Sequence, residues 1–174
     1  MRFLKKLSTK IDWLNEKIGS GISWLNLLLI AVVCYDVFTR YFLKKSSIAV
    51  QEMEWHIFAV IFLLGAAYTL KHDRHVRVDA LYNSFSLRTQ AWVDFLGSLL
   101  FLLPFVVLVI WASTTFVANS FSIGETSPDP GGLPARYLLK ACIPLAFVLL
   151  LLQGLSMNFR AALILWENGG EHDA

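Results

Sequence analysis

The sequence predicts an all-α integral membrane protein with four membrane-spanning helices. Its 174 residues are 56% hydrophobic and have a mean hydropathy of +0.58, whereas soluble domains are about 45–50% apolar. The charges fall in clusters between long apolar runs rather than along one helical face. We therefore expect a single small membrane domain over residues 1–174, without the basic footprint that nucleic-acid binding requires.

Residues 1–17 are expected to form an amphipathic helix that lies at an anionic membrane surface. Apolar residues recur there at helical spacing, lysines occupy the other faces, and Trp13 stands at the boundary. Such basic amphipathic segments are typical of interfacial helices. A solvated extension is the alternative. The segment lacks a small-residue cleavage signature, so a removed signal peptide is not expected.

The first two membrane helices are expected at about residues 18–42 and 53–71. The first begins with the small residues of GSGIS, which favour close helix packing. It ends near Asp36 and Arg40, which are four residues apart and should face each other. The second is short, because its 16 uncharged residues span roughly 24 Å of helix against a hydrocarbon core of about 30 Å.

The third and fourth membrane helices are expected at about residues 91–118 and 137–160. The third lies in an uncharged run of 30 residues, so it should be long or tilted, and Pro104 can kink it. A link with three prolines and three glycines separates the two helices, and helix cannot persist through it.

Four spans place both termini on one side of the membrane. Ten of the 15 Lys and Arg residues flank that side, so the positive-inside rule predicts cytoplasmic N- and C-termini. The tryptophans mostly lie near the ends of apolar runs, where indole rings favour the headgroup level. The expected interface anchors are Trp13, Trp24, Trp55, Trp92 and Trp166.

The cluster KHDRHVRVD after the second span holds the densest group of potential ligands. His72, His75 and Asp79 could share a helical face, as a metal site would need. However, three basic residues surround them, and no second His, Cys or Glu cluster completes a coordination set. We favour a membrane-boundary anchor or a subunit contact, and we expect no metal and no cofactor in this chain.

Few ionisable residues lie at membrane depth, and Asp36 and His56 are the nearest candidates. Such residues usually mark ion or proton pathways, so the chain alone is poorly equipped for transport. Two alternatives stay open, a self-sufficient oligomeric transporter or channel that uses Asp36, and an anchor subunit of a membrane redox complex. Facing histidines for haem are lacking. An enzyme is not expected, because no catalytic triad or phosphate-binding loop is present.

The order and spacing of several residues resemble the Q-type (DctQ-like) small membrane subunit of tripartite ATP-independent periplasmic (TRAP) transporters. The family pattern has an Arg, an acidic pair about a dozen residues on, a glycine thirteen beyond it, and His-x-x-x-Asp ten beyond the glycine. Two positions depart from the family pattern, Gln51 in the acidic pair and Trp55 where members often carry an arginine. The matching residues are Arg40, Tyr41, Glu52, Gly65, Ala66, His75, Arg77 and Asp79.

The resemblance implies a function in the inner membrane of a bacterium. In this family a periplasmic binding protein delivers an organic anion to a large membrane subunit, which moves it inward with sodium ions. The small subunit binds the large one and enlarges its stationary scaffold. The resemblance thus implies two protein partners, surrounding membrane lipids, and sodium ions in the large subunit. The matching residues would be subunit or structural contacts.

Two finer expectations follow. The segment GETSPDPGGLP of the last link resembles a subgroup associated with organic acids, including 2-oxo acids. We also expect Arg40 and Glu52 to lie near one another, because the first link turns the chain back between them.

Overall fold

The structure is a computed structural model that describes residues 2–72, 82 and 84–167. Over these residues it is helical with connecting links. Four stretches are long and apolar enough to cross a membrane, namely Lys5–Phe42, Ile48–Lys71, Leu87–Ser122 and Arg136–Trp166. The predicted all-α class with four such helices is therefore confirmed. The elements are α1 (Arg2–Phe42), α2 (Ile48–Lys71), α4 (Leu87–Gly97), the π-helical segment η1 (Ser98–Leu102), α5 (Leu103–Ser122) and α6 (Arg136–Glu167).

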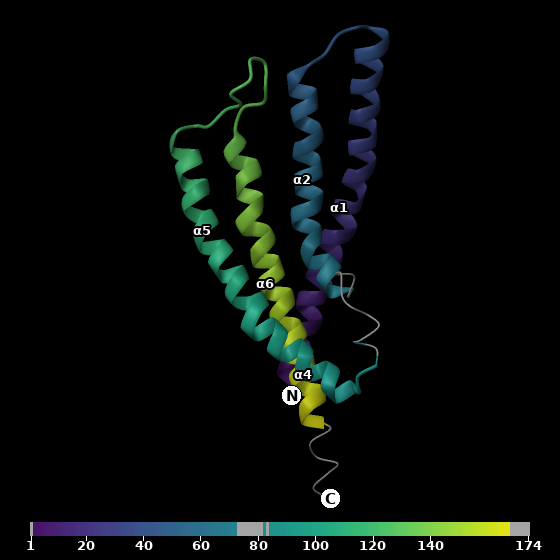
Figure 1. The fold of residues 1–174 in the computed structure, drawn as a ribbon, viewed down its shortest axis with the longest axis vertical. Coiled ribbons are helices and arrows are strands. Elements are labelled where there is room, and N and C mark those ends of the chain that lie inside the picture. Colours follow the sequence, from purple (N-terminus) through teal and green to yellow (C-terminus); the bar gives the residue numbers. More distant parts are fainter. Residues whose placement is uncertain (1, 73–81, 83, 168–174) are drawn as a thin grey trace, which may run out of the picture.

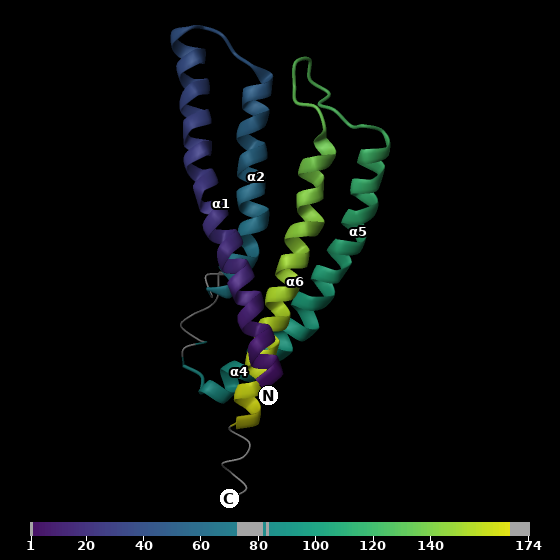
Figure 2. The ribbon, with the colours of Figure 1, turned by 180° about the vertical axis from the view of Figure 1, so that it is seen from behind.

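The long helices form two hairpins, α1 with α2 and α5 with α6, which diverge from one end of the molecule to the other (Figure 1). Residues 43–47 and 123–135 connect the hairpins' helices at one end, which we call the link end. The start of α1 and the end of α6 lie together at the opposite end, the terminal end (Figure 2). Helix α6 packs against α1, α2, α4 and α5, so it is the central element of the bundle.

Helix α1 is one unbroken helix of 41 residues where we predicted two. At 1.5 Å per residue it is about 60 Å long, twice the hydrocarbon thickness. Gly19 lies within this helix. Its missing side chain makes room for the Tyr68 ring of α2, which a Cβ would overlap. The N-terminal segment thus continues the first span. Its placement at a membrane surface stays a prediction.

The third span bends where α4 passes through η1 into α5. Ser86 caps its start by accepting a hydrogen bond from the Thr89 amide at 3.2 Å. Pro104 has no N–H to donate into the preceding turn, and the wider turn of η1 stands directly before it. Helix α4 consequently crosses the terminal end while α5 rises alongside α6 (Figures 1 and 2).

Small residues let the helices approach α6 closely. Ala146 and Ala161 of α6 are buried, as is Ala67 of α2. At Gly154, a Cβ would lie 3.0 Å from Leu102 and 3.3 Å from Leu103, so this glycine allows η1 and α5 to pack tightly. The interior also holds buried polar residues, and these define the candidate site.

Candidate functional site

A buried carboxylate, Glu52, ties three segments together at the link end. Its relative exposure is 4% although it belongs to a membrane-spanning helix. Oε1 accepts hydrogen bonds from Ser127 Oγ and, at 2.9 Å, from Nη2 of Arg136, while Oε2 accepts from the backbone N–H of Leu133 at 2.5 Å. The Glu52 cluster (Glu52, Ser127, Leu133 and Arg136) thus fastens α2 to the second link and to α6.

The second link folds over Glu52 because Gly132 has no side chain. A Cβ at this position would overlap the Ser127 side chain and lie 2.8 Å from Glu52 Oε2. The neighbouring Gly131 adopts a φ of +83°, which favours glycine. Gly131 and Gly132 therefore allow the link to bring backbone and hydroxyl donors to one carboxylate.

Trp55 lies one turn of α2 beyond Glu52 and contacts Arg136, the cation that pairs with Glu52. The guanidinium of Arg136 is 5.5 Å from the centre of its indole ring, within the range of cation–π attraction. The arginine that meets both Glu52 and Trp55 thus comes from α6.

The expected proximity of Arg40 and Glu52 does not produce a contact between them. Arg40 pairs with Asp36 one turn earlier in α1, as their spacing predicted. Glu52 lies on the face of α2 that packs against α6 and the second link, and its described partners all come from there. The first link reverses the chain between α1 and α2, but it does not determine on which face of α2 Glu52 lies.

A second ion pair closes the link end. Glu125 pairs with Lys140 of α6 and accepts a hydrogen bond from Ser120 Oγ at 2.6 Å. The Lys140 ammonium, followed by the Ser120 hydroxyl, lowers the pKa of the Glu125 carboxyl. The Lys140 ammonium also lies 4.0 Å from the centre of the Phe116 ring. This pair fastens the start of the second link to α6.

The terminal end is held by a row of side-chain hydrogen bonds between α1 and α6. We call it the terminal polar ladder (Ser8, Asp12, Asn15, Gln153, Ser156 and Arg160). Asn15 and Ser156 are almost fully buried, with relative exposures of 1% and 0%. The bonds join Ser8 Oγ to Ser156 Oγ (2.6 Å), Asn15 Nδ2 to Gln153 Oε1 (2.7 Å), Gln153 Nε2 and Ser156 Oγ to Asp12 Oδ1 (3.1 and 3.0 Å), and Arg160 Nε to Ser8 Oγ (3.2 Å), and Arg160 also pairs with Asp12.

The start of the KHDRHVRVD cluster contacts α1. Lys71 forms an ion pair with Glu16, and His72 Nε2 lies 3.0 Å from the same carboxylate. His75, Arg77 and Asp79 lie outside the described residues. In the part of the chain that the structure describes, no group of three His, Cys, Asp or Glu residues could hold a metal ion.

The other predicted contact and anchor residues lie on the surface of the bundle. Tyr41 is exposed in the last turn of α1, and Gly65 and Ala66 line an open groove between α1 and α2. A Cβ on Gly65 would meet nothing within 4 Å. The five predicted anchor tryptophans are all exposed. Exposure is required for an interface anchor, but it does not establish that role.

Sequence reasoning missed the partners of Glu52 and the whole terminal polar ladder. The ladder had a readable signal, because Ser8, Asp12 and Asn15 share one helical face and Gln153, Ser156 and Arg160 share another. The Glu52 partners had none, since Ser127 and Leu133 lie in an irregular link.

These features define a multi-pass membrane protein in which several buried polar side chains join one helix to another. Residues 29–163 match the family model of the tripartite ATP-independent periplasmic transporters, DctQ component. The chain belongs to this family of transporter subunits, which are not enzymes, and is therefore a small permease component. It is 26% identical over 140 residues to the ectoine TRAP transporter small permease protein TeaB of Halomonas elongata, covering 80% of this chain and 71% of that protein.

Proposed function

We propose that the chain is the scaffold and anchor subunit of a sodium-coupled importer for an organic acid that a periplasmic protein delivers. The observation that carries this proposal is the use of its charged groups. Within the described spans, Asp36, Glu52 and Arg136 are paired inside the chain, whereas Glu54 has no described partner. A subunit whose charges stabilise its own helices is suited to support a partner that holds the substrate and the sodium ions.

Co-purification and uptake test this proposal. We expect the chain to form a stable complex with the large membrane subunit of the same transporter. Proteoliposomes with both subunits and the binding protein should take up substrate along a sodium gradient. A chain that stays monomeric, beside a large subunit that transports normally alone, would contradict the proposal.

The groove between α1 and α2 is our proposed contact with a transmembrane helix of the large subunit. It has a volume of about 420 Å³ and opens at Gly65 and Ala66. Asn26 lines it near the middle of the uncharged run 18–35, is exposed, and makes one described side-chain hydrogen bond, to Ser23 O at 3.2 Å. A carboxamide at this depth favours a hydrogen-bonding helix over lipid tails.

Two glycine variants test this contact. Gly65→Leu should fill the groove and reduce recovery of the large subunit at least fivefold. Gly21→Leu is the matched control, because Gly21 also has open space around it but faces away from the groove at helical spacing. Equal recovery with both variants would disprove the contact while leaving the complex itself intact.

We further propose that the termini are cytoplasmic and that the link end faces the periplasm, near the docked binding protein. Ten of the 15 basic residues on the terminal side support this orientation. Both cysteines, Cys34 and Cys142, are free and can be replaced with alanine. In that background, Asp129→Cys should react with an impermeant maleimide added outside intact cells. Labelling only after lysis would show that the link end faces the cytoplasm.

The alternative of a self-sufficient transporter has less support. It needs Asp36 as an ion-binding group, and Asp36 is paired with Arg40. A redox anchor would need facing histidines, and His56 Nδ1 lies 2.6 Å from Glu52 O of its own helix. Flux in liposomes that contain this chain alone, or a haem absorption band, would revive these readings.

A further inference from the structure

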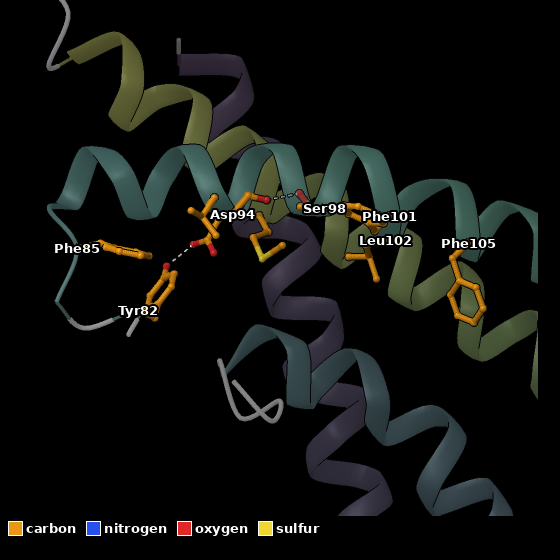
Figure 3. Close-up of a pocket in the computed structure, with 10 residues that line it drawn as sticks. Tyr82, Phe85, Asp94, Ser98, Phe101, Leu102 and Phe105 are labelled. Carbon is orange, nitrogen blue, oxygen red and sulfur yellow. Dashed lines mark hydrogen bonds between the residues drawn. The ribbon is translucent and has the colours of Figure 1, made fainter. Parts of the chain in front are cut away.

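Two cavities adjoin each other at the terminal end. The larger is an open groove of about 830 Å³ that follows α4, η1 and the start of α5. Figure 3 shows its residues in sequence along this bent helix, from Asp94 through Ser98 and Phe101 to Phe105. Most of its lining is apolar, and three of its residues come from η1.

The smaller cavity is a polar pocket of about 210 Å³ between the end of α2, α4 and α6. Lys71 and Arg160 line it from two different helices, and Gln90 adds a carboxamide. The two cavities share Tyr82, Asp94 and Met157 in their linings, and Tyr82 Oη donates to Asp94 Oδ2 at 2.7 Å where they meet (Figure 3). A pocket lined by two cations and the Asp94 carboxylate thus opens directly onto an apolar groove.

The order of the two cavities matches the depth of a membrane. Lys71 ends the apolar run of α2, and Arg160 closes the uncharged run 141–159 of α6, so the polar pocket lies at the membrane boundary. Phe101 and Phe105 lie two to three turns beyond Asp94 toward the centre of the third span. The groove therefore leads from the boundary into the hydrocarbon region.

The two cations keep donors for a ligand. Arg160 uses Nε for Ser8 and Nη2 for Asp12 among its described contacts, which leaves the two N–H groups of Nη1. Lys71 has three N–H donors and pairs with one carboxylate, that of Glu16. A phosphodiester is the anion best suited to such donors at a membrane boundary, and basic pockets between membrane helices bind phospholipid headgroups.

We propose that these adjoining cavities bind one glycerophospholipid, with its phosphodiester against Lys71 and Arg160 and an acyl chain along Phe101 and Phe105. The groove volume lies within the range of about 300–1,000 Å³ that is usual for ligand sites. The proposal requires only that the chain spans a membrane, so it stands independently of the large subunit. A lipid held there fills the space beneath the bend of α4.

Filling the groove tests the acyl-chain part of the proposal. Gly97 lines the groove, and a Cβ there would meet nothing within 4 Å, so Gly97→Leu should occupy the space without disturbing the helix. In detergent, binding of dioleoyl phosphatidylglycerol measured by native mass spectrometry should weaken at least tenfold. Gly21→Leu, which also enters open space, should bind as the unmodified chain does. Equal binding by the two variants would overturn the proposal.

Three ligands and two lysine variants test the headgroup part. Dioleoylglycerol, which lacks the phosphate, and glycerol 3-phosphate, which lacks the chains, should each bind at least tenfold more weakly than the phospholipid. Lys71→Met should weaken phospholipid binding about tenfold, and Lys71→Arg, which keeps the positive charge, should restore it. If Lys71 acted only through its pair with Glu16, Lys71→Met would leave binding unchanged. Tight binding of dioleoylglycerol would eliminate the headgroup site, and tight binding of glycerol 3-phosphate would make it a soluble-anion site.

Discussion

The two ends of the bundle are held by different kinds of polar contact. At the link end, donors from an irregular link and from α6 converge on one carboxylate, Glu52. At the terminal end, the polar ladder spreads its bonds over two turns of α1 and two turns of α6. The first arrangement depends on a single group, whereas the second distributes its stabilisation over several.

The two ends should therefore respond differently to substitution. A convergent cluster gives one defined position to the second link, because each donor must reach the same two oxygens. A distributed ladder tolerates the loss of one bond, since its neighbours keep the helices in register. We therefore expect single substitutions to have large effects at the link end and small ones at the terminal end.

The largest effect is expected for Glu52→Gln. The amide cannot accept all three donors, and it leaves the Arg136 guanidinium without its counter-charge, which is strongly destabilising in a buried site. The thermal midpoint of the purified protein in detergent should fall by roughly 10 °C. Glu54→Gln, two residues along the same helix, is the control. One oxygen of the Glu54 carboxylate is buried without a partner, so removing its charge should not lower the midpoint. Similar midpoints for the two variants would contradict the convergent role of Glu52.

A smaller effect is expected for Gly132→Ala, which tests whether the link must approach Glu52 closely. The added methyl group would overlap Ser127 and crowd the Glu52 carboxylate, and overpacking of this kind costs about 1–3 kcal/mol. Thermal unfolding should show the loss, and Gly97→Ala, at a glycine with open space, should show none. If Gly132→Ala unfolds as the unmodified chain does, the link does not depend on this contact.

The helices could be predicted from the sequence, because each signal is local. Uncharged runs identified four spans, and the spacing of Asp36 and Arg40 identified an ion pair within one turn. We expected two helices over residues 1–42, and the structure has a single helix from Arg2 to Phe42, because the change from charged to uncharged residues after residue 17 does not interrupt a helical backbone.

The contacts between distant segments could not be predicted in the same way. Glu52 was singled out by its spacing in the family pattern, but its partner was expected in the preceding helix. Arg136 lies 84 residues further on, and only the packing of α2 against α6 brings it into reach. The terminal polar ladder similarly depends on the pairing of α1 with α6, which local periodicity does not specify.

Single substitutions in the terminal polar ladder should lower the free energy of unfolding only slightly. A double-mutant cycle measures the contribution of one of its bonds. Asn15→Leu and Gln153→Leu should couple by about 0.6 kcal/mol, the mean for hydrogen bonds between membrane helices. Unfolding in mixed micelles with increasing dodecyl sulfate provides the free energies. Asn158 is the control partner, because its amide bonds to Gly154 O of its own helix, and its cycle with Asn15 should give no coupling. A coupling above about 2 kcal/mol for Asn15 with Gln153 would mean that this end, too, depends on a single contact.

The smallest effect is expected at Glu125, and its pH dependence distinguishes an ion pair from a neutral contact. Because Lys140 and Ser120 lower the pKa of Glu125 in the folded chain, the unfolded chain binds a proton at this carboxyl more readily than the folded chain. The stabilisation is therefore fully present above the unfolded pKa of about 4.3, and it is lost as the pH falls through the lower pKa of the folded state. At pH 7, Glu125→Gln should lower the thermal midpoint by about 1–2 °C, and the difference from the unmodified chain should close on acidification. Lys140→Met should remove most of this pH dependence, because the ion pair is its main source. A difference that stays constant down to pH 3 would show that Glu125 stabilises the link end without its charge.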